Sequence, residues 1–354
     1  MAWWPVTESS PIGVDVGSRA IKAVQLAPPS GGAAPAVAAA AVIPRRRFEG
    51  MIDDDEARRL RDVLDRRGFR CGDVVIAVPH EHLMSDLLEL PPRESGAPIR
   101  QIAAMELART NRCDPNSFEL ALWDVPGAGK SGTPSPAMAA ACPHEQAEEL
   151  LDRFASVGLR IRAIDVASCA LARAAACMLD ADGPTAMLDI GATGANFVLV
   201  LDGLVVYQRR LADVGLGRLH GALQEQFGLD DELIGHLLTG EDDGAPEDGA
   251  TTGAGAAPAD NAISAYIEGL CEEVRASLSY AEHLYRHEVG RMLVVGGGAV
   301  VRGLPPRLAS LLGMDLRPLT PCDLSACAPS IQDRCRAPGL VAALGLALHE
   351  GEHA

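Results

Sequence analysis

The sequence is poor in aromatic residues and contains no long apolar run. Aromatic side chains make up 4% of its 354 residues, although hydrophobic residues as a whole make up 48%. No apolar stretch approaches the roughly 20 residues that a membrane-spanning helix needs. The first ten residues, MAWWPVTESS, lack the basic start of a secretory signal. These absences argue against a membrane-spanning or a secreted protein. The apolar content is high enough to fill the cores of a globular protein with two or three packed units.

The sequence also lacks an excess of positive charge and a paired cysteine motif. Its formal net charge is -17, and such a surface repels phosphate backbones and anionic lipids, which argues against a nucleic-acid binder. None of the nine cysteines forms a CxxC pair, so the spacing of Cys322, Cys327 and Cys335 argues against zinc. Nine cysteines without a signal peptide are typical of a reducing compartment. We therefore expect a cytoplasmic protein in which any phosphate site is local.

A polar turn interrupts an apolar hairpin near the start of the chain. The stretch PIGVDVGSRAIKAVQL, residues 11–26, alternates as a strand, breaks at Gly17 and continues as a second strand. A plain β-hairpin explains this pattern without a ligand. Alternatively, the turn is a phosphate clamp, in which backbone amides and Ser18 approach an anion and Asp15 holds a hydrated magnesium ion. This stretch alone leaves both interpretations open.

The order of the predicted elements indicates an α/β protein. After the hairpin come a strand at 36–44, a helix at 53–68 with a capping box of Asp53 and Glu56, and a buried strand at 73–79. From His82 onward the predicted order is β-α-β-β-α-β, the pattern of a small ferredoxin-like module. The linker at 126–136 contains Gly-Lys-Ser without the spacing of a Walker motif, so we expect a flexible turn there.

The aspartate-glycine turn recurs in the second half of the chain. The segment TAMLDIGATGANFVLVLDG, residues 185–203, carries Asp189 into a glycine turn and then continues as an apolar strand. Such an internal repeat predicts a duplicated architecture. Further on, the acidic Gly/Ala-rich segment at 240–260 is expected to be a disordered loop, and residues 261–286 are expected to form one long helix.

The candidate site consists of three glycine turns that follow strands. They are Asp15-Val16-Gly17, Asp189-Ile190-Gly191 and Gly296-Gly297-Gly298. Each is weak alone, because a glycine after a strand also permits close packing. Together they fit a two-lobed fold whose hairpins hold the phosphates of one nucleotide from opposite sides. Two aspartates that face each other across a cleft repel unless a divalent cation lies between them, which predicts Mg²⁺.

With these motifs, the chain resembles the actin-like ATPase superfamily and, within it, the PilM family of type IV pilus assembly proteins. The segments LLELPP, GLRIRAIDVASCALARA and LGLALHE carry the likeness to PilM. The resemblance implies two lobes of duplicated ribonuclease-H-like units with the ferredoxin-like subdomain inserted. The implied ranges are 11–80 with 165–184 for the first lobe, 81–164 for the inserted subdomain, 185–215 with 288–350 for the second lobe, and 216–287 for its smaller subdomain.

The resemblance also implies which residues hold the nucleotide. The superfamily's first hairpin reads D-x-G-S-x-x-x-K, which Asp15, Gly17, Ser18 and Lys22 match. Asp15 and Asp189 would bind Mg²⁺ through water. The residues implied to line ATP or ADP are Asp15, Gly17, Ser18, Arg19, Lys22, Asp189, Gly191, Thr193, Gly296, Gly297 and Gly298, with Glu272, Arg275 and Ser279 on the long helix. An ordinary solvated helix face is the alternative for the last three.

Two departures from the family pattern bear on catalysis. Ala167 stands where PilM-like chains often have glutamate, and Arg19 stands where a small residue is common. Hydrolysis needs a residue that orients a water molecule, and no residue is assigned to that role. We therefore expect nucleotide binding, with ATP hydrolysis weak or absent.

The family further implies a partner, the cytoplasmic N-terminal tail of a PilN-like inner-membrane protein, bound in a groove involving the inserted subdomain. Other pilus alignment components are implied partners, and self-association stays open. The protein would thus be cytoplasmic and peripheral to the inner membrane. Two alternatives remain, a small-molecule kinase of the same superfamily and an FtsA-like division protein. A kinase needs a catalytic aspartate where Gly194-Ala195-Asn196 offers none, and FtsA ends in a basic amphipathic helix, whereas this chain ends in HEGEHA.

Overall fold

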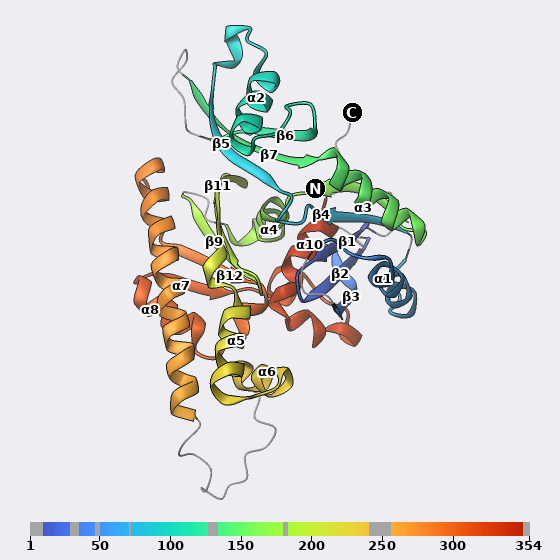
Figure 1. Cartoon of the computed structure of the whole chain (residues 1–354), viewed down its shortest axis with the longest axis vertical. Helices are drawn as coiled ribbons and strands as arrows, with labels where there is room; N and C mark the ends of the chain where they lie inside the picture. The colour runs from blue at the N-terminus through green and yellow to red at the C-terminus, as the bar shows by residue number, and fades with distance from the viewer. Residues whose placement is uncertain are drawn as a thin grey trace, which may run out of the picture.

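The computed structural model describes residues 10–28, 35–46, 50–70, 72–126, 134–179, 183–240 and 256–349. These residues form two five-stranded sheets and one three-stranded sheet. Figure 1 shows the two larger sheets in two lobes side by side, with the smaller sheet above them. Most of the predicted acidic loop and most of the linker with Gly-Lys-Ser lie outside the described residues.

The two larger sheets have the same topology. The first has the order β3-β2-β1-β4-β8, with β1 (Ile12–Val16), β2 (Ala20–Ala27), β3 (Ala36–Pro44), β4 (Asp73–Ala77) and β8 (Arg160–Asp165). The second has the order β11-β10-β9-β12-β13, with β9 (Thr185–Ile190), β10 (Ala195–Leu201), β11 (Leu204–Leu211), β12 (Arg291–Val295) and β13 (Asp315–Pro318). In each, three antiparallel strands are followed by two parallel pairings. This shared order confirms the two-lobed, duplicated α/β architecture that the repeat predicted.

The helices cover the sheets and fill the space between them. In the first lobe they are α1 (Asp54–Arg66), α3 (His144–Ser156), α4 (Ala167–Ala174) and α10 (Val341–Ala347). In the second they are α5 (Leu216–Phe227), α6 (Asp231–Thr239), α7 (Ala256–Tyr285) and α8 (Leu304–Leu312), followed by the short α9 (Pro321–Leu324). The 3₁₀ turns are η1 (Arg93–Ser95), η2 (Ala176–Met178), η3 (Ala212–Val214), η4 (Gly297–Val300), η5 (Pro329–Ile331), η6 (Arg334–Arg336) and η7 (Pro338–Leu340).

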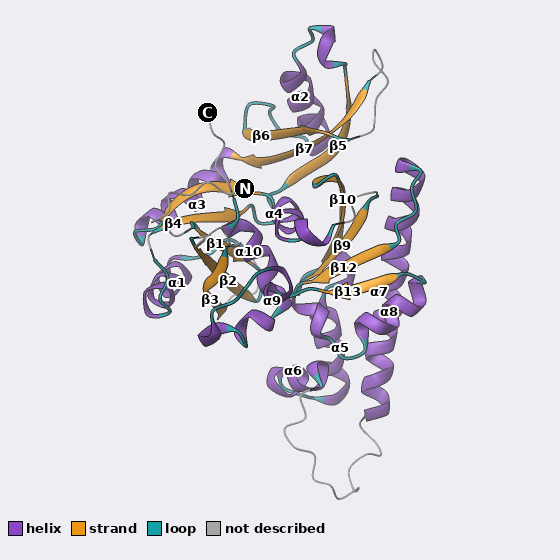
Figure 2. Ribbon diagram, turned by 180° about the vertical axis from the view of Figure 1, so that it is seen from behind, coloured by secondary structure: helices purple, strands orange, loops and turns teal. Residues whose placement is uncertain are grey.

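Helices α1 and α7 are both expected from the sequence, and the structure shows where each begins. The predicted capping box begins α1, because the Asp53 side chain accepts from the Glu56 amide at 2.9 Å and Glu56 accepts in return from the Asp53 amide at 3.3 Å. Helix α7 begins at Ala256, earlier than the expected residue 261. Figure 2 shows α7 and α8 next to the second sheet, and the buried face of α7 shares a core with that sheet.

The inserted subdomain has the predicted element order but needs one correction. Its sheet has three antiparallel strands, β5 (Met84–Leu90), β7 (Ser135–Pro143) and β6 (Phe118–Asp124), packed against α2 (Ile99–Asn111). The last helix and strand of the expected four-stranded ferredoxin-like module, α3 and β8, belong to the first lobe instead. There β8 pairs with β4, and α3 buries Leu150 and Phe154 in the lobe's core. The physical reason is that β4 is an apolar, buried strand whose second edge requires a partner.

Helix α10 packs against the first lobe through close backbone contacts and reaches the second lobe through a shared apolar cluster. A Cβ atom on Gly13 of β1 would lie 2.0 Å from the Ala343 carbonyl oxygen, and one on Gly345 would lie 1.8 Å from the Ala170 carbonyl oxygen. Glycine at these two positions therefore lets α10 contact β1 and α4 directly. Buried apolar residues of α4, α10 and both sheets form one continuous cluster. Within the described ranges, no helix has the length and apolar character to cross a membrane.

Candidate functional site

The first hairpin presents a carboxylate and an ammonium group side by side. Asp15 and Lys22 are direct partners in the β1–β2 ladder, and Lys22 Nζ donates to Asp15 Oδ2 at 2.7 Å. The turn is tight, because the Gly17 amide donates to the Ala20 carbonyl at 3.0 Å. A Cβ atom on Gly17 would lie 3.0 Å from Lys22 Nζ. Ser18 is half-buried in the same turn. The hairpin interpretation is therefore right about shape, and the ammonium group of Lys22 lies directly against Gly17.

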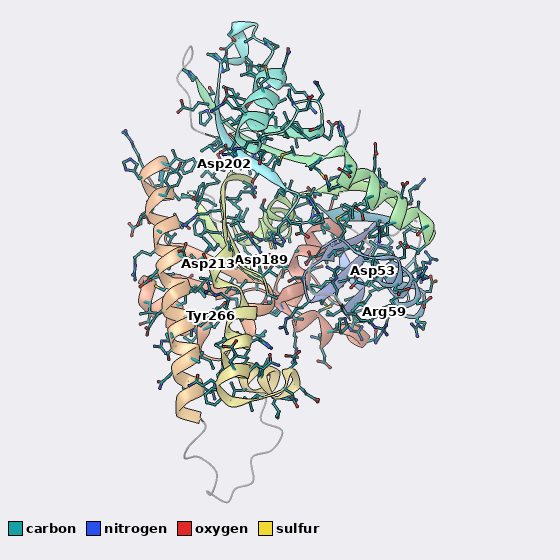
Figure 3. The ribbon with its side chains drawn as sticks, viewed as in Figure 1. Asp53, Arg59, Asp189, Asp202, Asp213 and Tyr266 are labelled. Atoms are coloured by element: carbon teal, nitrogen blue, oxygen red, sulfur yellow. The ribbon has the colours of Figure 1, made fainter. Side chains whose placement is uncertain are left out.

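Asp189 brings a second carboxylate to Lys22 from the other lobe. Figure 3 shows Asp189 near the middle of the molecule, between the two lobes. Burial is the largest influence on its pKa and, together with the charge of Asp15, raises the pKa of Asp189 to about 6, although Lys22 lowers it. Burial lowers the pKa of Lys22, but the two carboxylates outweigh this effect and the pKa of Lys22 is raised. The structure thus brings Asp15, Lys22 and Asp189 together, and we call them the interlobe charge cluster.

The glycine run after β12 contacts this cluster. Gly296 has a φ of +84°, and a Cβ atom there would lie 2.3 Å from Asp189 Oδ1, so only glycine fits. A Cβ atom on Gly298 would lie 2.2 Å from Ile190 Cγ2, whereas Gly297 has no heavy atom within 4 Å of its Cβ position. Gly296 and Gly298 therefore pack against the end of β9, and Gly297 leaves open space beside it.

The turn η7 also lies next to the interlobe charge cluster. A Cβ atom on Gly339 would lie 3.5 Å from Lys22 Cε and 3.8 Å from the Gly297 amide nitrogen. The Gly296 amide also donates to the Pro338 carbonyl at 3.3 Å. Backbone of η7 therefore lies next to both Lys22 of the first hairpin and the glycine run.

The second hairpin turn is held by an arginine that sequence reasoning missed. The turn is closed by a hydrogen bond of 2.9 Å from the Gly191 amide to the Gly194 carbonyl. Arg210 of β11 donates to Thr193 Oγ1 at 2.9 Å, and its guanidinium lies 3.1 Å from His80 Nε2 in the first lobe. Burial, followed by the Arg210 charge, lowers the pKa of His80, so the neutral ring can accept this contact. The sequence offered only adjacent arginines after an apolar strand, which is no specific signal.

Arg19, at the tip of the first turn, lies near the second lobe. Burial is the main cause that lowers the pKa of His220 on α5, and the positive charge of Arg19 is the second. The two side chains therefore lie close enough for their charges to interact. The Arg19 carbonyl also accepts from the Arg45 amide at 2.9 Å. Arg19 thus lies where the first turn approaches α5.

Glu272, Arg275 and Ser279 lie apart from the interlobe charge cluster. All three are exposed on α7. Arg275 donates to the Leu311 carbonyl at 2.8 Å, at the C-terminal end of α8, whereas the glycine run precedes the N-terminal end of that helix. A helix of this length spans about 13 Å. The α7 residues that contact Arg302 and Arg307 at the start of α8 are Asp260, Ser264 and Glu268. The assignment of Glu272, Arg275 and Ser279 to the nucleoside stays a prediction.

The donor set of the interlobe charge cluster suits a hydrated Mg²⁺ ion. Across the described ranges, no group of three or more His, Cys, Asp or Glu side chains forms a ready-made metal cage. Magnesium usually binds one or two protein carboxylates and keeps several waters and phosphate oxygens as its other ligands. Asp15 and Asp189 supply two carboxylates from opposite lobes. Burial is the main cause that raises the pKa of Asp189 to about 6, and a divalent cation next to it would favour the charged carboxylate.

Comparison with protein families decides the identity of the chain. A family model described as type IV pilus assembly protein PilM matches residues 13–351. The chain belongs to the PilM family. None of the curated proteins matches the sequence of this PilM-family chain.

Solved structures show the same fold. A chain of the structure described as the PilM-PilN type IV pilus biogenesis complex matches with a TM-score of 0.77 and 22% sequence identity, covering 97% of this chain and 98% of that one. The ethanolamine utilization protein EutJ from Carboxydothermus hydrogenoformans matches with a TM-score of 0.56 and 16% identity, covering 99% and 92%. These likenesses agree with the actin-like two-lobed fold of the PilM-family chain.

Proposed function

We propose that this chain binds ATP or ADP with Mg²⁺ between its lobes and acts as a cytoplasmic scaffold of a type IV pilus, or related secretion, assembly machine. The observation that carries the nucleotide part is the interlobe charge cluster, which joins two carboxylates and one ammonium group from the two lobes. Membership of the PilM family supports the role in pilus assembly.

Each member of the cluster has its own role in this proposal. Lys22 supplies a compact positive charge to the phosphates. Asp15 and Asp189 would hold Mg²⁺ through its water shell, and the bound ion would neutralise phosphate charge. The backbone amides of the two hairpin turns would donate to phosphate oxygens. Lys22 is paired with Asp15 in the structure described here, so a phosphate would compete with that carboxylate for the ammonium group.

The proposal covers nucleotide binding and assigns no hydrolytic residue. Ala167 stands at the start of α4 without a carboxylate. Its neighbour Ser168 is engaged across the lobes, where it donates to Gln208 Oε1 at 2.5 Å. A water molecule would therefore have to be oriented by another group. A scaffold whose state depends on bound nucleotide needs no fast turnover.

Calorimetric titration with Mg-ATP and Mg-ADP tests the nucleotide part. We expect Asp15→Asn and Lys22→Ala each to weaken binding at least tenfold, because each removes a charge from the phosphate and metal site. Asp202→Asn is the matched control, since Asp202 is exposed at the opposite end of the β9–β10–β11 hairpins and asparagine tolerates its positive φ. Unchanged affinity in both cluster variants would exclude this cluster as the nucleotide site.

We also propose that the chain binds the cytoplasmic tail of a PilN-like inner-membrane protein, which would hold it at the membrane. The solved relative was described as a PilM-PilN complex. The structure offers an apolar groove of about 300 Å³ between the inserted subdomain and the second lobe. Its lining includes Leu87, Pro136, Leu201, Leu284 and Tyr285. A short apolar segment of an otherwise polar tail would fit such a groove.

Fluorescence polarisation with a labelled synthetic tail tests the partner and its location. Leu284 lines the groove and is 41% exposed, so Leu284→Glu should weaken tail binding without disturbing the core. Leu311 on α8 is similarly exposed at 39%, and Leu311→Glu is the matched control. Equal binding by both variants would place the tail elsewhere, and the absence of binding to the unchanged protein would refute the partner.

A further inference from the structure

Three cysteines gather on the segment that follows the second sheet. Cys322 of α9 lies with its Sγ 3.6 Å from the Sγ of Cys327, and Cys335 lies close enough to interact with Cys327. All three are free thiols. Cys335 is fully buried, whereas Cys322 and Cys327 are half-buried and can be reached from solvent. The Sγ–Sγ distance of 3.6 Å therefore joins the two cysteines of the three that are only half-buried.

The segment from 319 to 336, which we call the clasp, connects the two lobes. At its start, the Leu319 amide donates to the Val294 carbonyl of β12 at 2.9 Å. Further along, Cys327 forms an isolated bridge with Val37 of β3, the edge strand of the first sheet. The flanking hydrogen bonds measure 2.7 and 3.0 Å. Arg334 then donates to the Ala40 carbonyl at 3.0 Å. Cys327 is therefore the residue through which the clasp pairs with the first lobe.

We propose that Cys322 and Cys327 form a reactive dithiol site that a peroxide oxidises to an intramolecular disulfide. The two sulfur atoms must approach each other by about 1.5 Å to reach the length of an S–S bond. Four residues separate Cys322, in the short helix α9, from Cys327, in the bridge to Val37. In the first step one thiol takes an oxygen from hydrogen peroxide, which yields a sulfenic acid and one water. The second thiol then displaces the hydroxyl as a second water, so that two electrons pass from the sulfurs to the peroxide.

The surroundings of the thiols indicate the order of reaction. Burial is the main cause that raises the pKa of Cys327 and of Cys335, which keeps both protonated and slow to attack an oxidant. Cys322 is therefore the thiol that meets the peroxide first, and Cys327 resolves the sulfenic acid. The product closes a short ring that ties α9 to Cys327, the residue that forms the bridge with Val37. A thiol such as glutathione reverses the step by exchange.

Differential alkylation and peptide mass mapping of the full chain test this site. With one equivalent of hydrogen peroxide we expect a cross-link of Cys322 with Cys327 that dithiothreitol reverses, while Cys335 remains alkylatable after unfolding. Phenylarsine oxide should bind the reduced protein at one equivalent and protect the same two thiols from alkylation. Cys322→Ser should abolish both results, and Cys113→Ser, at an exposed cysteine, should abolish neither.

Two results would overturn the site. One is that Cys322 and Cys327 both stay free at a peroxide dose that oxidises the exposed Cys113. The other is a cross-link that joins Cys327 to Cys335 instead. Both measurements use the unsubstituted protein, so neither depends on whether a variant folds. Their outcome is independent of nucleotide binding by the reduced protein, because the dithiol and the interlobe charge cluster share no residue.

Discussion

Removing the negative charge of Asp189 should stabilise the nucleotide-free protein at neutral pH. The substitution Asp189→Asn keeps the shape of the side chain and abolishes its charge. Burial is the main cause that raises the pKa of Asp189 from 3.8 to about 6, so the native state binds a proton more tightly than the unfolded chain does. The difference between these pKa values corresponds to about 3 kcal/mol in the free energy of unfolding.

The sign of the effect follows from proton linkage. Well below pH 3.8, Asp189 is protonated in both the native and the unfolded state, so it causes no loss of stability. Between about pH 4 and 6 the unfolded chain releases this proton before the native protein does, and the free energy of unfolding falls as pH rises. Above about pH 6 the loss is complete. Asp189→Asn should therefore gain up to about 3 kcal/mol over the unchanged protein between pH 4 and 7.

Urea unfolding followed by circular dichroism, at pH values from 4.5 to 7.5 without Mg²⁺, measures this difference. Asp165→Asn is a control of opposite sign. Burial raises the pKa of Asp165, but His349 and Arg173 outweigh burial and lower it, so this carboxylate stabilises the native state above its unfolded pKa. Mg-ATP should stabilise the unchanged protein more than Asp189→Asn. A difference between Asp189→Asn and the unchanged protein that stays constant with pH would refute the reasoning.

Three further predictions concern single positions. Gly296→Ala should abolish Mg-ATP binding in calorimetry and lower the thermal midpoint, because its Cβ would lie 2.3 Å from a carboxylate oxygen of Asp189, whereas Gly297→Ala, with open space, should leave the thermal midpoint nearly unchanged. Gly345→Ala should prevent soluble expression or shift thermal unfolding by many degrees, since its Cβ would lie 1.8 Å from a carbonyl oxygen of α4. Asp53→Ala should cost about 1 kcal/mol in urea unfolding through loss of the α1 cap.

The sequence predicts the elements that depend on local patterns. Alternation and capping predict the hairpins and α1, because hydrogen bonds between near neighbours determine them. The repeat of Asp15 and Asp189 predicts that two hairpins meet, because duplicated units place equivalent turns facing each other. The sheet that β8 joins could not be predicted in this way. Which sheet a strand joins depends on an edge more than 80 residues earlier in the chain, as the pairing of Arg160 with Asp73 shows.

Strand β11 shows why the rest of the site could not be predicted from sequence. Its residues alternate like those of any half-buried strand, yet Arg210 contacts the second hairpin turn and His80 of the first lobe. Near its other end, the Val205 carbonyl accepts from the Trp123 indole of the inserted subdomain at 2.7 Å. Two of these three partners, His80 and Trp123, come from distant parts of the chain. A period of two distinguishes the faces of a strand but not the partners on a face. The contacts of β11 with the second hairpin turn and with the inserted subdomain therefore become recognisable only after folding.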